Sequence, residues 1–499
     1  MLGLGTLSSV ARGVLHRQFG SLLWSLQTVR GIIGHRCLSS PPKKPSPPPG
    51  GSMIPRVNIG IFGEMNAGKS TFMNRITSQE TSIVDAHPGT TADVKVALME
   101  LHNIGPVKLF DTAGLDELGV LGEKKKKKTL NVVKESDIVF LVVDPLASLS
   151  ITNDKKSFDV HKEVLSLAQR REKDVFLVFN EFSRKKTEYE REHGSGSYGE
   201  LLKSICSSVG VPGDFLALDL TKAEATNAIV EFTEKHYEHH LNRVPLLPSS
   251  CLGKDKTVFM NVPMDAETPS GRLLRPQAMT QEFCLRNFTT TLAYRMDLQA
   301  GRNKDDDGVR EAERVRFVDA VTKVKPSLIV TDSQAMDLCA PWTTDVNMRD
   351  VELTTFSIMM INHMAGGNLK VFVDGLKALK SIDKKKKILI AEACNHNRIT
   401  DICEDIGTVQ IPNKLKKLFG EDVKLEHAFG REFPELKLDE YQLVIHCGGC
   451  MIDSQKMMAR MQDCLEAGIP ITNYGLLLSY FQSPQALAKV LRPWGLSID

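Results

Sequence analysis

The sequence lacks any apolar run long enough to cross a lipid bilayer. A membrane-spanning helix needs about 18 or more consecutive apolar residues, and no window of this chain approaches that length. Hydrophobic residues make up 42% and charged residues 25% of the chain, close to the average of soluble globular proteins. We therefore expect a folded, soluble chain that does not associate with membranes.

Acidic residues are absent from the first 50 positions, which contain six Lys or Arg and many Ser. This composition is typical of an organellar transit peptide, with a candidate processing site at Arg36–Ser40 and a Pro-rich linker from Pro41 to Gly51. The alternative is a basic tail without a targeting role. The interpretation predicts an organellar matrix protein, in a hydrogenosome or mitochondrion, with a plastid as a further candidate.

Excess positive charge is also lacking, since 63 Lys and Arg stand against 61 Asp and Glu and six of the basic residues belong to the leader. The rest of the chain offers no general reason to bind nucleic acid. Ten cysteines are spread over 499 residues without the dense, even spacing of a disulfide scaffold. Metal ligation in a reducing compartment explains them better.

A phosphate-binding loop is the first positive signal. The apolar pattern from Arg56 to Phe62 predicts a buried strand, and it leads directly into GEMNAGKS at positions 63–70. Glycines let the backbone N–H groups face phosphates, Lys69 neutralises β and γ oxygens, and Ser70 ligates Mg²⁺. The nucleotide-binding residues predicted in this segment are Gly63, Asn66, Ala67, Gly68, Lys69, Ser70 and Thr71.

Two further loops are in the order found in GTPases. A second strand at Val107–Phe110 ends in Asp111, which can hold Mg²⁺, and Gly114, whose N–H can sense the γ-phosphate. The intervening loop at 88–93 offers Thr91 as the switch I Mg²⁺ ligand, with Thr90 as the alternative. The sequence therefore predicts Mg²⁺-dependent GTP hydrolysis by Lys69, Ser70, Thr91, Asp111 and Gly114, used as a conformational switch.

Two residues refine this prediction. Leu115 stands where many small GTPases have a water-orienting Gln, so water must be activated differently. Asn66 resembles the asparagine of potassium-activated GTPases related to Era and TrmE, which implies a potassium ion beside the phosphates. The alternative for Asn66 is a plain loop residue.

The sequence motif for guanine recognition is degraded. After the expected strand Val175–Phe179 an Asn-Lys-x-Asp motif is expected, but the chain has Asn180-Glu181-Phe182-Ser183, which keeps Asn180 for the nucleotide and lacks the aspartate. Asp219 is a candidate replacement acceptor. Relaxed nucleotide specificity or weak binding is the other interpretation.

A cysteine and histidine site is predicted in the C-terminal third. Cys394 and His396 follow a buried-strand pattern, and His446, Cys447 and Cys450 follow another. Ligands at the carboxyl ends of neighbouring parallel strands can converge in one crevice. Three thiols favour a 4Fe-4S cluster over Cys₃His zinc, and the fourth iron is left to His396, His446 or an exchangeable ligand.

Other features near this site support a carrier. Gly448 and Gly449 let backbone N–H groups approach the sulfurs, and a helix expected near Ser454 directs its positive end toward an anionic cluster. An open iron corner suits a carrier, because another molecule can bind there and leave again. Cys464 shares an apolar helical face and is predicted to be a core residue.

Together the two sets of motifs resemble the HydF family of FeFe hydrogenase maturation GTPases, from about residue 55 to about residue 485. Further matching stretches are Val262–Leu273, Val330–Gln334, Leu353–Ser357, Ile390–Ala393 and Gly468–Gly475. The resemblance implies a carrier with one 4Fe-4S cluster. It also implies receipt of a two-iron subcluster from the radical maturases HydE and HydG, and delivery to apo FeFe hydrogenase.

We accordingly expect an α/β protein of three folded domains. A P-loop GTPase domain at 54–245 is followed by a small α/β dimerisation domain at 256–345, which implies a homodimer, and by an α/β iron–sulfur domain at 346–499. The leader and linker occupy 1–50. The alternative function is an Era-like or TrmE-like organellar GTPase acting in RNA modification or ribosome assembly.

Overall fold

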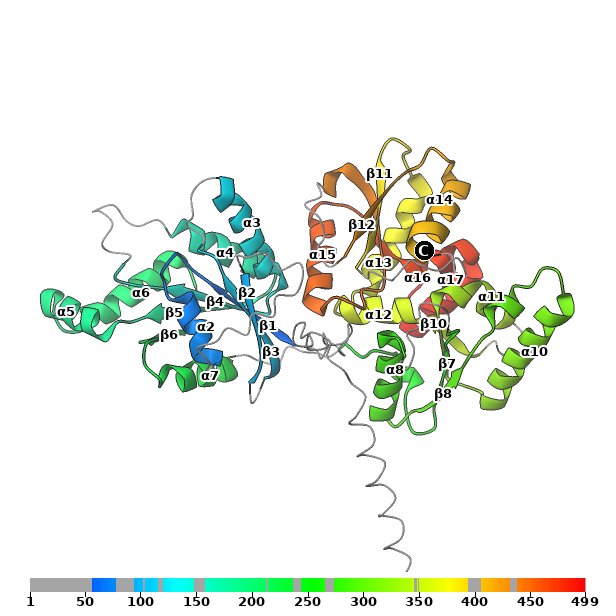
Figure 1. The fold of residues 1–499 in the computed structure, drawn as a ribbon, viewed down its shortest axis with the longest axis horizontal. Helices are drawn as coiled ribbons and strands as arrows, with labels where there is room; N and C mark the ends of the chain where they lie inside the picture. Colours follow the sequence, from blue (N-terminus) through cyan, green and yellow to red (C-terminus); the bar gives the residue numbers. More distant parts are fainter. Residues whose placement is uncertain are drawn as a thin grey trace, which may run out of the picture. The chain divides into compact units, whose positions relative to one another are not determined.

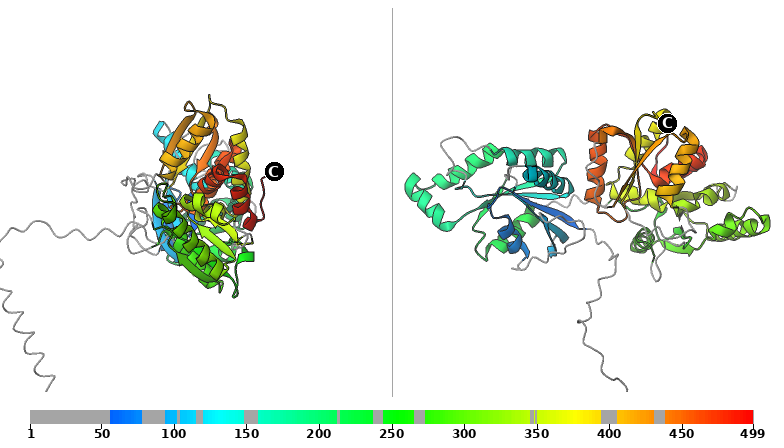
Figure 2. Two further views of the ribbon diagram at one scale, coloured as in Figure 1. Left: turned by 90° about the vertical axis from the view of Figure 1, so that its right-hand side faces the viewer. Right: turned by 45° about the horizontal axis from the view of Figure 1, so that its top comes forward.

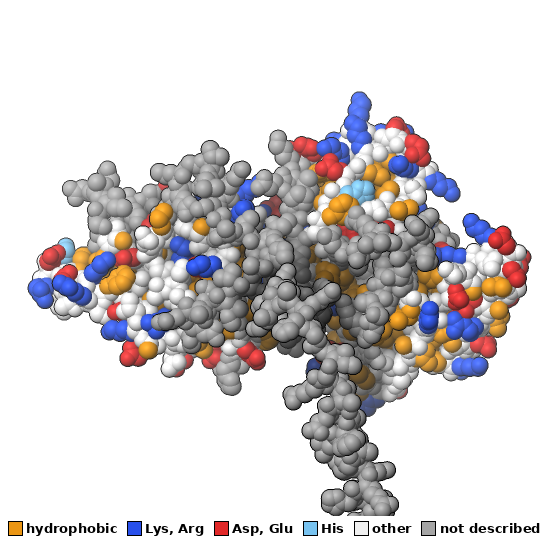
Figure 3. Space-filling model, in the orientation of Figure 1, with side chains coloured by type: hydrophobic (Ala, Val, Ile, Leu, Met, Phe, Trp, Pro, Cys, Tyr) orange, Lys and Arg blue, Asp and Glu red, His pale blue; other side chains and the backbone are white. Residues whose placement is uncertain are grey.

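The computed structural model describes most of the chain from residue 56 onward. The described residues are 56–77, 94–101, 104–114, 120–147, 158–211, 214–236, 244–264, 273–344, 348, 350–393, 405–430 and 438–498. Within these residues, every helix is too short or too polar to traverse a bilayer. On the face seen in Figure 3, basic and acidic side chains are interspersed over the described surface, as expected from nearly balanced charge.

The first sheet has six strands in the order β2-β3-β1-β4-β5-β6. Its strands are β1 Val57–Phe62, β2 Val94–Leu101, β3 Gly105–Thr112, β4 Ile138–Val143, β5 Asp174–Asn180 and β6 Phe215–Leu218. Only the β2–β3 pair is antiparallel among these described strands. Every residue of β1 and β4 is buried, as expected for predominantly apolar strands in a sheet covered on both faces.

Helices cover both faces of this sheet (Figures 1 and 2). They are α2 Lys69–Thr77, α3 Val120–Glu135, α4 Asp159–Arg170, α5 Ser183–His193, α6 Ser197–Val209 and α7 Ala225–His236. One core packs α2 and α7 against the sheet, for instance through Phe72 and Ile229. The other packs α3, α4 and α6, for instance through Val133, Val164 and Leu202. The expected α/β P-loop domain is present, with helices on both faces of its sheet.

The second sheet has four parallel strands in the order β10-β9-β7-β8. The strands are β7 Thr257–Asn261, β8 Thr290–Tyr294, β9 Leu328–Thr331 and β10 Glu352–Thr355. Its helices are α8 Arg275–Arg286, α9 Leu298–Gly301, α10 Asp307–Val324, α11 Met336–Trp342 and α12 Phe356–Met364. Because β10 pairs with β9, this sheet extends to Thr355, which corrects the boundary expected between residues 345 and 346.

The third sheet has four parallel strands in the order β12-β11-β13-β14. The strands are β11 Lys387–Glu392, β12 Lys424–Phe429, β13 Tyr441–His446 and β14 Ile471–Asn473. Its helices are α13 Leu369–Gly375, α14 Ile411–Phe419, α15 Ser454–Glu466, α16 Tyr474–Gln482 and α17 Pro484–Leu491. As predicted, the strands that precede the two cysteine motifs are neighbours.

The two four-stranded sheets share one strand order, in which the first strand lies between the second and the third. Connections leave such a sheet in opposite directions at the first and third strands, and open α/β sheets generally bind ligands outside the carboxyl ends of these two strands. In the third sheet those strands are β11 and β13. One hydrophobic core, from Leu246 to Leu491, joins the second and third sheets.

Short helical segments also occur in the part of the chain that the structure describes. They are the 3₁₀ turns Ser249–Cys251, Ser333–Ala335, Leu376–Ser381, Leu438–Glu440 and Arg492–Trp494, and a π-helical turn at Ile406–Gln410.

Candidate functional site

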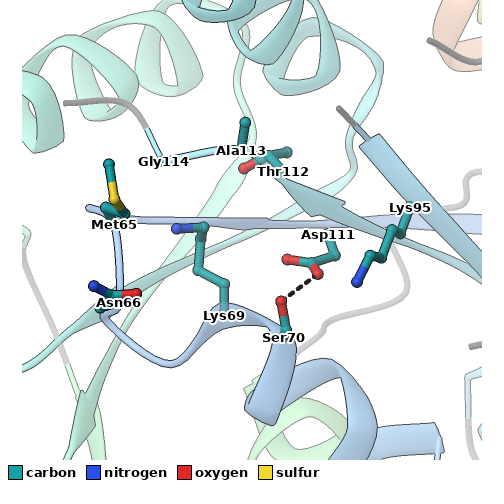
Figure 4. Close-up of a pocket in the computed structure, with 9 residues that line it drawn as sticks. All are labelled: Met65, Asn66, Lys69, Ser70, Lys95, Asp111, Thr112, Ala113 and Gly114. Atoms are coloured by element: carbon teal, nitrogen blue, oxygen red, sulfur yellow. Dashed lines mark hydrogen bonds between the residues drawn. The ribbon is translucent and has the colours of Figure 1, made fainter. Parts of the chain in front are cut away.

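A cavity of about 220 Å³ lies where β1, β3 and the start of α2 meet. Figure 4 shows the side chains that surround it. They are Met65, Asn66, Lys69, Ser70, Lys95, Asp111, Thr112, Ala113 and Gly114. The predicted P-loop and the predicted Asp111–Gly114 segment are thus brought together around one space.

Lys69 is buried beside the loop that it belongs to. Its ammonium donates hydrogen bonds to the carbonyl oxygens of Gly63 at 3.2 Å and Glu64 at 2.7 Å. A buried ammonium needs acceptors, and phosphate oxygens in the cavity supply stronger ones because they are charged. The side chain is therefore placed to bind the phosphates of a nucleotide.

Ser70 and Asp111 are hydrogen-bonded to each other beside the cavity. The Ser70 hydroxyl donates to Asp111 Oδ2 at 2.7 Å (Figure 4). The other carboxylate oxygen, Oδ1, is buried and has no hydrogen-bond partner among the described residues. A hydroxyl and a carboxylate with unused lone pairs are the oxygen ligands that Mg²⁺ prefers, so the donor set fits the ion.

The P-loop backbone is held in a conformation that its residue types permit. Gly68 has φ +104°, and a Cβ there would lie 2.4 Å from the Asn180 side-chain nitrogen. Asn66 also has a positive φ, +61°, in the region that asparagine tolerates best after glycine. The Asn180 amide donates to the carbonyl of Ala67 at 3.1 Å. Asn180 therefore holds the loop from the end of β5.

The other predicted nucleotide residues differ in their placement. Gly63 is buried at the end of β1, whereas Thr71 is exposed on α2 and does not line the cavity. Thr90 and Thr91 lie outside the described residues. Sequence reasoning missed Lys95, which lies directly opposite Asp111 in the β2–β3 pair and lines the cavity. Only the register of the β2–β3 pair places Lys95 at the cavity, and the sequence did not specify that register.

Asp219, the candidate replacement for the missing guanine acceptor, connects two loops instead. It accepts hydrogen bonds from the Ser183 hydroxyl at 3.0 Å and from the Thr221 N–H at 3.0 Å. Burial raises the pKa of this carboxyl, but the hydrogen bonds from Thr221 and Ser183 outweigh it and hold the pKa below its ordinary value. The carboxylate is thus already engaged within the protein.

Cys447 directly follows the carboxyl end of β13 in the third sheet and receives backbone hydrogen bonds. It is 6% exposed, and its sulfur accepts from the N–H of Ala393 at 3.2 Å and of Gly449 at 3.4 Å. Two N–H donors stabilise a thiolate, which is the form that binds metal. The Cys447 environment therefore fits a metal-bound thiolate, and Cys450 lies half-buried in the same loop.

The remaining predicted ligands do not complete a metal site within the described residues. Cys394 and His396 lie outside them, and the described part of the chain holds no group of three metal-ligating side chains. His446 is fully buried, with Nδ1 2.8 Å from the Cys447 carbonyl oxygen and Nε2 2.9 Å from Arg460. Its two ring nitrogens are both engaged, contrary to the expectation for a ligand.

The helix after the cysteines begins at Ser454, as predicted. Its first turn is capped by Asp453, which accepts from the Lys456 N–H at 2.9 Å, so a carboxylate already occupies the positive end. Cys464 is fully buried, and burial raises the pKa of its thiol to about 12. It is a core residue, as its helical position indicated.

Comparison with known families adds two matches. A model described as the hydrogen maturase F tetramerization domain matches residues 370–493, and a model described as the 50S ribosome-binding GTPase matches residues 58–181. The two matches together identify a HydF-like GTPase. The first match contains all five predicted cluster ligands, although its description assigns oligomerisation to a segment that we expected to bind the cluster.

Individual proteins resemble this HydF-like GTPase over a small part of its length. GTPase Der of Nautilia profundicola is 39% identical over 89 residues, which are 18% of this chain and 19% of the relative. GTPase Der of Nitratiruptor sp. is 32% identical over 130 residues, or 26% of each protein. The chain thus spans about a quarter or less of these curated relatives.

A solved structure of Aquifex aeolicus Era bound to GDP·AlF₄⁻ also matches. Its sequence identity is 15% and its TM-score 0.28, over 53% of this HydF-like GTPase and 98% of Era.

Proposed function

We propose that this chain is a hydrogenase maturation GTPase that carries an iron–sulfur cargo. It holds a 4Fe-4S cluster, receives a two-iron subcluster precursor and transfers it to apo FeFe hydrogenase. One observation carries the proposal. A segment similar to hydrogen maturase F, which contains Cys394, Cys447 and Cys450, lies in the same chain as a GTPase domain with a formed P-loop.

In the GTPase reaction, Lys69 binds the β and γ phosphates, and Ser70 with Asp111 holds Mg²⁺. When bound, the ion would supply positive charge that offsets the charge developing during phosphoryl transfer. Asn180 keeps the loop in its binding conformation through Ala67. Gly114 lines the same cavity, and its N–H is the proposed sensor of the γ-phosphate. Asn66 lines the cavity, where a potassium ion would supplement the charge of Lys69.

In the cluster site, Cys394, Cys447 and Cys450 are the proposed ligands of three irons. When bound, the cluster supplies a fourth iron at which another molecule can bind and leave. The Ala393 and Gly449 N–H groups hold the Cys447 sulfur in place and offset its negative charge. HydE and HydG are the proposed donors, the protein acts as a homodimer, and the organellar matrix is the proposed location.

Anaerobic reconstitution with iron and sulfide tests the cluster, read by paramagnetic resonance. Added imidazole should alter the spectrum if the fourth position is exchangeable. The purified, loaded protein should activate apo-hydrogenase. Lys69→Ala should abolish GTP hydrolysis and leave the cluster, and Cys447→Ser should do the opposite. Loss of both properties in either folded variant contradicts two separate sites, and firmly bound zinc instead of iron contradicts the carrier.

A second candidate is an Era-like or TrmE-like GTPase that acts in RNA modification or ribosome assembly. It is favoured by the description of the matching GTPase model. A protein that sediments with ribosomal subunits in a nucleotide-dependent manner, and that retains no iron after reconstitution, supports this candidate over the first.

A further inference from the structure

Arg460 and His446 form a buried pair that contacts the backbone of Cys447. His446 is the last residue of β13 and is fully buried, and Arg460 on α15 is 3% exposed. Arg460 Nη1 lies 2.9 Å from His446 Nε2, and His446 Nδ1 lies 2.8 Å from the carbonyl oxygen of Cys447. A chain of contacts thus runs from α15 through the imidazole to a proposed ligand residue.

The chemistry of the partners determines which imidazole nitrogen carries the hydrogen. A carbonyl oxygen only accepts, so Nδ1 must donate to Cys447. A guanidinium only donates, so Nε2 must accept from Arg460. The ring is therefore the neutral Nδ1–H tautomer, with both nitrogens occupied. A metal ligand must offer a free lone pair, and this ring has none left.

We infer that His446 is not an iron ligand and that it acts with Arg460 as a positioning pair, which holds the Cys447 backbone so that its sulfur stays beside the N–H groups of Ala393 and Gly449. This inference rests on the proposed cluster function. It assigns the conspicuous His of the HCGGC segment a supporting role. The fourth iron position is then left to His396 or to an exchangeable ligand.

The pair is part of a wider set of bonds that joins all four strands at this loop. Arg460 also donates to the carbonyl of Gly430, which follows β12, at 3.3 Å. Asn473 at the end of β14 donates to the His446 carbonyl at 3.2 Å. Ala393, after β11, donates to the Cys447 sulfur. Because each strand end contributes one contact, the loop has little freedom to adopt another conformation.

Arg460 also places a permanent positive charge behind the loop. Arginine stays protonated in proteins, and its low exposure means that water screens this charge weakly. A nearby positive charge stabilises the more negative, reduced state of an anionic cluster. Replacing Arg460 by a neutral residue should therefore make the cluster reduction potential more negative, which a purely structural role would not predict.

The decisive test is pulsed paramagnetic resonance on the reduced, reconstituted full-length protein. Wild type and His446→Asn should show the same nitrogen couplings to iron, because no His446 nitrogen is bound. Asn retains an N–H near the position of Nδ1, so cluster retention should fall in the order wild type, His446→Asn, His446→Ala. External imidazole should not restore cluster retention in the His446→Ala variant. A strong imidazole coupling present only in wild type overturns the inference.

Substitutions of Arg460 provide an independent test of the inference. Arg460→Gln should lower iron retention at least about twofold and shift the potential negative, whereas Arg460→Lys should keep the potential near wild type because it keeps the charge. GTP hydrolysis should be unchanged in all of these variants. An unchanged potential in a cluster-loaded Arg460→Gln protein contradicts the electrostatic role of Arg460.

Matched controls come from the same domain. His427→Asn removes a half-buried histidine that contacts the Gly407 carbonyl, and Arg492→Gln removes a surface arginine paired with Glu352. Both control variants should retain the cluster and keep the wild-type reduction potential. If wild type binds no cluster, the proposed function fails together with this inference. If wild type binds it and the His446 and Arg460 variants match the controls, the inference alone fails.

Discussion

The side-chain amide of Asn180 donates a hydrogen bond of 3.1 Å to the carbonyl oxygen of Ala67, joining the end of β5 to the P-loop. The same amide lies against Gly68, where any side chain would collide with it. The asparagine that survives from a degraded base-recognition motif thus serves the phosphate loop. Its contribution to nucleotide binding does not depend on the lost aspartate.

Asn180→Ala should weaken GDP and GTP binding to a similar degree. The net contribution of one hydrogen bond is about 0.5–1.5 kcal/mol, which corresponds to a roughly 2- to 13-fold rise in Kd. Titration with a fluorescent nucleotide analogue measures it. Asn58→Ala is the matched control, since Asn58 is a buried asparagine in the same sheet that donates to the Glu135 carbonyl. Equal affinities in both variants would contradict the role given to Asn180.

Asp111→Asn should raise the Mg²⁺ concentration needed for half-maximal GTP hydrolysis. The amide can still accept from Ser70, but the negative charge beside the ion is lost. Hydrogen bonds to charged groups contribute about 1.5–3 kcal/mol, so we expect a shift of roughly 13- to 160-fold. A Mg²⁺ titration of the hydrolysis rate measures the shift. Asp174→Asn, at the opposite end of β5, should behave as wild type, and an unshifted Asp111→Asn curve would refute the site.

Asp219→Asn should not exchange GTP preference for XTP preference. Replacing a carboxylate that binds the guanine base by an amide would exchange this preference. The Asp219 oxygens, however, accept hydrogen bonds from Ser183 and Thr221. Competition of GTP and XTP against a fluorescent nucleotide measures the ratio in both proteins. A reversal of the ratio would show that Asp219 reads the base.

Cys464 and Cys339 should resist alkylation in the native protein at pH 8. Burial raises the pKa of both thiols to about 12, so the reactive thiolate is scarce and access is blocked. Mass spectrometry after iodoacetamide treatment, with and without denaturant, measures the labelling. Half-buried Cys206 serves as the accessible comparison. Rapid native labelling of Cys464 would indicate that α15 is loosely packed.

Lys489 should make the protein more stable as the pH rises from about 8 to 10.5. Burial, followed by the charge of Arg492, lowers the pKa of Lys489 to about 8 from 10.5, although Glu352 acts in the opposite direction. In this window the unfolded chain holds a proton that the folded chain has released, so the free energy of unfolding increases with pH. Below pH 8 both states are protonated and the gain is absent.

Lys489→Met should remove this pH dependence. Urea unfolding of both proteins across the window gives the difference in unfolding free energy. The difference should change in favour of wild type as pH rises, because only wild type has the titrating amine. Parallel pH profiles would mean that the amine is solvated in the folded protein.

Much of the nucleotide site follows from local sequence. The strand, glycines and Lys69 of the P-loop are consecutive, and the Asp111–Gly114 segment directly follows an apolar strand. Such short-range patterns specify backbone shape and charge without knowledge of distant contacts. Lys95 was missed because its position in the cavity depends on pairing with Asp111, which lies on another strand.

The sheet boundary and the His446 assignment show the limits of that reasoning. Residues after 345 looked like the start of a new domain, but β10 is the edge strand of the second sheet. His446 stands beside Cys447 in the sequence, which suggested a shared ligand role. Its partner, Arg460, comes from the following helix, and only the packed structure shows that the imidazole is already engaged.

The sequence by itself determined the chemical groups, namely a phosphate loop, a Mg²⁺ carboxylate and paired thiols at strand ends, because each is encoded by residues a few positions apart. The tertiary structure decided which of those groups meet, as with Asn180 and Ala67, 113 positions apart. The physical reason is that strand order, register and helix packing depend on burying apolar surface over the whole domain. The spacing of residues along the chain does not determine which polar atoms are brought together by that burial.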